Sequence, residues 1–86
     1  MKGTPYFWNR VRVKRPEVQP EWIERVLAHP VAEQAQEHNR VRFWGRIEEF
    51  GGRYLRVVTL ADRRTVHNVM WDRNFGRKAA RGEPLP

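Results

Sequence analysis

The stretch that decides the fold runs from Arg40 to Leu60 and reads RVRFWGRIEEFGGRYLRVVTL. It contains two runs rich in β-branched and aromatic residues, a composition typical of strands. Between them stands Gly51-Gly52, and both central positions of a type I′ turn require the positive φ that glycine adopts without strain. We therefore predict a β-hairpin with strands over 41–50 and 53–60, joined by a two-residue turn.

Further strands are predicted on both sides of this hairpin. Residues 65–71 form a third candidate strand, after a weaker turn signal at 61–64. Residues 6–14 alternate well enough between apolar and polar side chains to be a strand. Residues 31–38 fit either a polar strand or a loop.

A helix is predicted over 20–28. Pro20 suits the first helical position, Glu21 stands in the first turn, where the helix dipole favours acids, and Pro30 ends the helix. Its apolar residues fall at helical spacing and form one stripe: Trp22, Ile23, Val26 and Leu27. The predicted fold is α+β, with one main helix packed on a curled antiparallel sheet of about four strands.

Size and composition allow one small domain. The chain has 86 residues, of which 40% are hydrophobic and 31% charged. We expect a single α+β domain over 1–75 and a flexible basic tail over 76–86. The chain has no cysteine, and its three histidines are too dispersed in the sequence for a metal site. No metal and no cofactor are predicted.

The charge balance favours polyanionic partners. There are 17 Lys+Arg against 10 Asp+Glu, a net charge of +7, and 14 of these cations are arginine. Arginine suits planar, bidentate contact with phosphate or carboxylate. No apolar run approaches the roughly 18 residues that a membrane span requires, and residues 1–8 lack the apolar centre of a signal peptide. We expect a cytoplasmic protein without a membrane partner, whose exposed sheet edges suit either self-association or pairing with a strand of a partner.

The two-residue turn fixes which side chains share a face. It pairs Phe43 with Leu60, and a two-residue turn at Asp62-Arg63 would add the third strand to the same scheme. The face under the helix would then hold Val41, Phe43, Ile47, Val58, Leu60, Val69 and Trp71. The opposite face would hold Arg42, Trp44, Arg46, Glu48, Phe50, Arg53, Leu55, Val57, Arg64, Val66, Asn68 and Met70.

A three-residue turn after Leu60 is the alternative. It would move His67 and Trp71 onto the open face. In exchange, Val66, Asn68 and Met70 would enter the core.

The predicted open face suits single-stranded nucleic acid. Guanidinium groups can track phosphates while bases stack on aromatic rings, at about 1–3 kcal/mol per stacked base. The predicted RNA-binding residues are Arg42, Trp44, Arg46, Arg53 and Arg64. The same face would suit an acidic protein, and an ordinary solvated face whose arginine stems cover apolar neighbours has the same composition.

Metal-free RNA cleavage is the one reaction that the residues leave open. It needs a base for the 2′-hydroxyl proton, an acid for the leaving oxygen and cations that stabilise the transition state. The candidates are His67 or Glu48 as base and Arg46, Arg56 or Arg73 as the stabilising cation. The competing interpretation of His67 is a hydrogen-bonded structural residue.

Residues 20–75 resemble a family of small uncharacterised bacterial proteins. The similar segments are 22–30 (WIERVLAHP), 40–47 (RVRFWGRI), 53–58 (RYLRVV), 65–68 (TVHN) and 72–75 (DRNF). This family is grouped with the RelE/ParE-like and BrnT-like toxins of toxin–antitoxin pairs. The resemblance implies a RelE-like fold, RNA cleavage, and an acidic antitoxin as partner.

Two functional hypotheses follow. The first is an RNA-directed, toxin-like protein that acts as a metal-independent endoribonuclease. The alternative is a non-catalytic binding module for RNA or for an acidic protein partner.

Overall fold

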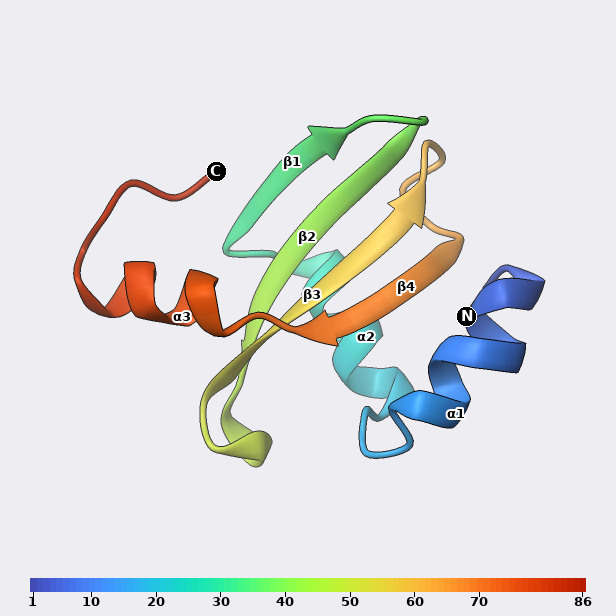
Figure 1. Cartoon of the computed structure of the whole chain (residues 1–86), viewed down its shortest axis with the longest axis horizontal. Coiled ribbons are helices and arrows are strands. Elements are labelled where there is room, and N and C mark those ends of the chain that lie inside the picture. Colours follow the sequence, from blue (N-terminus) through green and yellow to red (C-terminus); the bar gives the residue numbers. More distant parts are fainter.

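The computed structural model describes all 86 residues. Four strands form one antiparallel sheet in the order β1-β2-β3-β4, so neighbours in the sheet are also neighbours along the chain (Figure 1). Their bounds are Ala32–Gln36 for β1, Arg40–Ile47 for β2, Arg53–Leu60 for β3 and Val66–Trp71 for β4. The predicted α+β class with four antiparallel strands is confirmed, and the ambiguous segment 31–38 supplies one of those strands.

Helix α2 (Pro20–Ala28) lies across one face of the sheet, where the sequence predicted the main helix (Figure 1). Its apolar stripe is buried, and Ile23 has no exposed surface. The helix approaches β2 most closely at Gly45, where a Cβ atom would stand 2.6 Å from Cγ2 of Val26. A side chain at Gly45 would therefore push the helix off the sheet.

The segment 6–14 is helical, so the predicted strand there is wrong. A π-helical segment η1 (Phe7–Val11) runs into α1 (Arg12–Lys14). Phe7 and Val11 are buried in the main core, and residues four apart share one face of a helix. The strand was predicted from a weak alternation of apolar and polar side chains, whereas the two buried side chains of this segment follow the spacing of a helix.

Residues 2–4 tie this helix to the edge of the sheet. The N–H of Val66 donates to the carbonyl of Lys2, and the N–H of Thr4 donates to the carbonyl of Val66, both at 2.9 Å. The hydroxyl oxygen of Thr4 then accepts the N–H of Phe7 at 3.1 Å, as a helix cap does. The segment therefore covers part of the β4 edge.

The β2–β3 connection is longer than predicted. A 3-10 turn, η2 (Glu48–Phe50), precedes Gly51 and Gly52, which have φ of 70° and 71°. Phe43 consequently pairs with Val57 and not with Leu60. The predicted two-residue turn and its register are wrong.

This shift of three residues exchanges the two faces of β3, because the side chains of a strand alternate with a period of two. Leu55 and Val57 lie in the main core, although the sequence placed them on the open face. Val58 and Leu60, predicted for the core, lie on the opposite face.

Two tertiary contacts explain the η2 turn. Arg25 of α2 donates to both carboxylate oxygens of Glu49 at 3.0 and 2.7 Å, and this interaction lowers the pKa of Glu49 to about 2. The ring of Phe50 stacks on Trp71 with centroids 4.5 Å apart. A prediction of the turn from Gly51-Gly52 alone cannot take account of either contact.

The β3–β4 pairing contains a bulge at His67. Val58 pairs with Asn68 and Thr59 with Val66, so His67 has no partner across the ladder. Next to the turn the pairing follows the register of the predicted two-residue turn, and beyond the bulge it follows that of the alternative three-residue turn. Neither predicted register therefore holds along the whole strand. The side of β4 toward the core is formed by Val66, Val69 and Trp71.

Helix α3 (Arg73–Ala80) packs on the face of the sheet opposite α2. The sequence predicted a flexible tail over 76–86, whereas the structure continues this helix through the first part of that segment. Asp72 caps the helix by accepting the N–H of Phe75 at 3.0 Å. Phe75 is buried against Trp44, a contact between distant parts of the sequence that local composition does not reveal.

Candidate functional site

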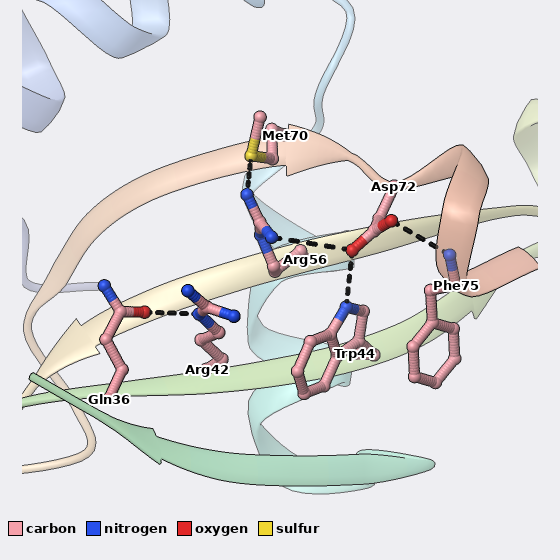
Figure 2. A network of polar contacts seen from close by, with 7 residues as sticks. All are labelled: Gln36, Arg42, Trp44, Arg56, Met70, Asp72 and Phe75. Carbon is pink, nitrogen blue, oxygen red and sulfur yellow. Dashed lines mark hydrogen bonds and ion pairs between the residues drawn. The ribbon is translucent and has the colours of Figure 1, made fainter. Parts of the chain in front are cut away.

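The face opposite α2 carries the predicted arginines of β2. Figure 2 shows Arg42, Trp44 and Arg56 on this side of the sheet, with α2 behind it. Alternation along β2 places Arg46 on the same face. We call this the open face.

Trp44 is not available to stack on a base, so its predicted role in binding is wrong. It is only 3% exposed, and its ring stacks on Phe75 with centroids 5.0 Å apart and planes 10° apart. Its Nε1–H donates to a carboxylate oxygen of Asp72 at 3.0 Å (Figure 2). Trp44 anchors α3 on the sheet.

A basic groove of about 870 Å³ lies between α3 and the adjoining end of the sheet. Tyr54 and Trp71, both half-buried, supply its aromatic surface. Its one carboxylate, Asp72, is occupied by bonds to Trp44 and Phe75. Five arginines line this groove: Arg15, Arg46, Arg53, Arg73 and Arg77.

Most of these guanidinium groups have no acidic partner. Only Arg46 forms an ion pair, with Glu48, and Arg46 also donates to the carbonyl of Gly52 at 3.2 Å. The guanidinium of Arg53 lies 5.4 Å from the centre of the Phe50 ring, a cation–π contact. The Nε of Arg15 is enclosed without a hydrogen-bond partner. The groove therefore presents a largely uncompensated positive charge.

A second, smaller basic site lies at the other end of the open face. This arginine cavity has a volume of about 290 Å³, and its cationic lining is Arg40, Arg42 and Arg56. Arg42 Nε donates to Gln36 Oε1 at 2.5 Å. Arg56 lies between Met70 and Asp72, with its Nη1 3.6 Å from Asp72 Oδ2 (Figure 2). Burial lowers the pKa of Arg56, and the charge of Asp72 opposes that shift.

His67 stands at the edge of the arginine cavity. Its Nδ1 lies 3.0 Å from the hydroxyl oxygen of Thr4, and its ring stacks on Tyr6 with centroids 5.0 Å apart. Burial and, to a smaller extent, the charge of Arg40 lower the pKa of His67 below its usual 6.5. The imidazole is therefore neutral at pH 7.

The three predicted catalytic residues do not come together. Glu48 is exposed in the η2 turn and paired with Arg46, and Arg73 lines the basic groove. His67 is next to Asn68, which the strand pairing places level with Val58 and Arg42, so six residues along the chain, about 20 Å at the ordinary rise of a strand, separate this level from Glu48. No single phosphodiester contacts both Glu48 and His67.

The remaining predicted binding residues divide between the sites. Arg53 lines the basic groove, whereas Arg64 is exposed in the β3–β4 turn and lines neither site. Sequence reasoning missed three arginines of the two sites: Arg15, Arg40 and Arg77. Helical spacing from Arg73 would have indicated Arg77, had the last segment been treated as a helix.

Comparison of the chain with protein-family models, with curated proteins and with solved structures finds no match. The structure brings together no group of three or more histidine or acidic side chains that would hold a metal ion. None of its helices has the length and apolar character needed to span a bilayer.

Proposed function

We propose that the protein binds single-stranded RNA, with the phosphates held in the basic groove. The observation that carries the proposal is the concentration of five arginines in one groove, four of them without an ion-pair partner. Single-strand binding sites combine such a positive groove with aromatic surfaces for bases, and here the half-buried rings of Tyr54 and Trp71 line the groove, with one face of Trp71 already covered by Phe50.

The resemblance of residues 20–75 to RelE/ParE-like and BrnT-like toxins supports RNA as the ligand and a RelE-like assignment of the fold. An acidic antitoxin-like protein would contact the same arginines and would compete with RNA. The separation of Glu48 from His67 supports the binding hypothesis over the ribonuclease hypothesis.

The test is fluorescence anisotropy with a short labelled single-stranded RNA, between about 50 and 200 mM salt. We expect affinity to fall steeply with salt, because bound phosphates release counterions. The double variant Arg73→Gln/Arg77→Gln should bind at least about tenfold more weakly, with the slope of log K against log salt reduced by about 1.4. Binding that does not depend on salt would contradict the proposal.

Arg64→Gln is the matched control, because Arg64 is an exposed arginine outside the groove. It should retain the affinity of the unmodified protein. In parallel, the RNA is incubated with the protein in chelator and then sized. We expect intact RNA, and discrete cleavage products would instead support the ribonuclease hypothesis.

A further inference from the structure

The arginine cavity differs from the basic groove in size and lining. Its volume of about 290 Å³ equals that of roughly ten water molecules in the liquid, which is too small for a nucleic acid chain to pass through. Val58 is its only hydrophobic lining residue, and the His67 ring, which also lines it, is already stacked on Tyr6. The lining selects a small, strongly polar group.

The charge of the cavity is that of an anion site. Three guanidinium groups and one carboxylate, that of Glu37, line the cavity, and Asp72 compensates the charge of Arg56 from outside it, so the excess positive charge belongs to Arg40 and Arg42. Neither Arg40 nor Arg42 forms an ion pair. Their charges are therefore available to a ligand.

The arginines are already held in position. Arg42 is bonded to Gln36, and Arg40 Nη1 donates to the carbonyl of His38 at 3.0 Å. Arg56 is fixed between Met70 and Asp72. Each guanidinium has five N–H donors, so these contacts leave donors free. Groups fixed in advance lose less entropy when a ligand binds.

We propose that the arginine cavity binds a terminal phosphate monoester of RNA. A monoester carries a charge of about −1.5 to −2 at pH 7 and three terminal oxygens, which suit the two guanidinium groups without ion-pair partners and the free donors of the cavity. A phosphodiester within a chain carries only one negative charge. This inference rests on the proposed function, because the rest of the strand would lie in the basic groove.

The two sites are close enough to hold one strand. Arg40 of the cavity and Arg46 of the groove lie on the same face of β2, about 20 Å apart at the ordinary rise of a strand. An RNA bound in the groove would then run along the open face and place one end in the cavity.

The test compares three RNAs of one sequence with an internal label: one with a 5′-phosphate, one with a 3′-phosphate and one with hydroxyls at both ends. At least one phosphorylated RNA should bind about tenfold more tightly than the hydroxyl-ended RNA. Arg42→Gln should abolish this difference. Arg77→Gln should weaken the binding of all three and keep the difference.

Arg40→Gln is a second cavity variant and should likewise abolish the preference for the phosphorylated RNA. Arg64→Gln is again the control. Circular dichroism confirms that each variant is folded. Equal binding of the three RNAs would overturn the cavity proposal alone, whereas failure to bind any RNA would overturn the groove proposal. Inorganic phosphate and 5′-adenosine monophosphate are the competing probes. If the protein binds either probe but no RNA, and Arg42→Gln abolishes binding of that probe, the ligand of the cavity is a free phosphate or a small phosphate monoester and not an RNA end.

Discussion

His67 shows how one side chain at a bulge links stability to pH. Its pKa is about 6.5 in the unfolded chain and lower in the folded protein. At a pH between these two pKa values the unfolded chain therefore binds more protons than the folded protein. Stability is therefore highest above pH 6.5 and falls as the pH decreases toward the folded value.

We expect urea unfolding to show this decrease just below pH 6.5 and the variant His67→Gln to remove it. The acidic groups Glu49 and Asp62 have pKa values of about 2, so the stability that they contribute is lost at a lower pH. His38→Gln, at an exposed turn position, is the control and should keep the slope. A slope unchanged by His67→Gln would rule out this origin.

Gly45 determines how closely α2 packs on the sheet. In Gly45→Ala the new methyl group would overlap Val26 and destabilise the protein by about 1–3 kcal/mol, as overpacking does. Val26→Ala empties that space, so the double variant should be more stable than the sum of the two single effects predicts. Urea unfolding of the four proteins measures the coupling, and strict additivity would show that the contact is not limiting.

At the scale of elements, α3 is held mainly by one aromatic side chain. Phe75 is buried between Trp44 and Tyr54, and α3 in turn forms a wall of the basic groove. Anchoring of α3 and formation of the groove are therefore one event.

Phe75→Ala should cost about 3 kcal/mol of stability and should weaken RNA binding as well. Urea unfolding measures the first effect, and the indole N–H resonance of Trp44 reports the loss of its packing. Lys78→Ala, on the exposed side of the same helix, is the control. Unchanged stability of Phe75→Ala would show that α3 does not depend on this anchor.

At the scale of the whole molecule, the sequence pattern predicted those elements that depend mainly on residues close together in the chain. The helix over 20–28, the strand over 53–60 and the antiparallel sheet of four strands were predictable from periodicity and turn chemistry. The β2–β3 register was not, because Glu49 and Phe50 are held by α2 and β4.

The candidate site was predictable only in part for the same reason. The arginines of β2 lie on the open face as alternation predicted, but Trp44 is covered by α3, which the composition of the last residues did not indicate. The basic groove depends on side chains from α3, the start of β3, the ends of β2 and β4, and the loop after α1. No single stretch of sequence contains it.

The pairing of residues 2–4 with β4 also constrains the order of folding. Thr4 and His67, which are in contact, are 63 residues apart along the chain. Closing so large a loop costs conformational entropy before the contact contributes any favourable free energy, so such contacts form late and slow the folding of a small domain. The β2–β3 hairpin joins neighbouring segments and can form early, whereas the helix over 7–14 reaches its final place only after β4 has joined the sheet.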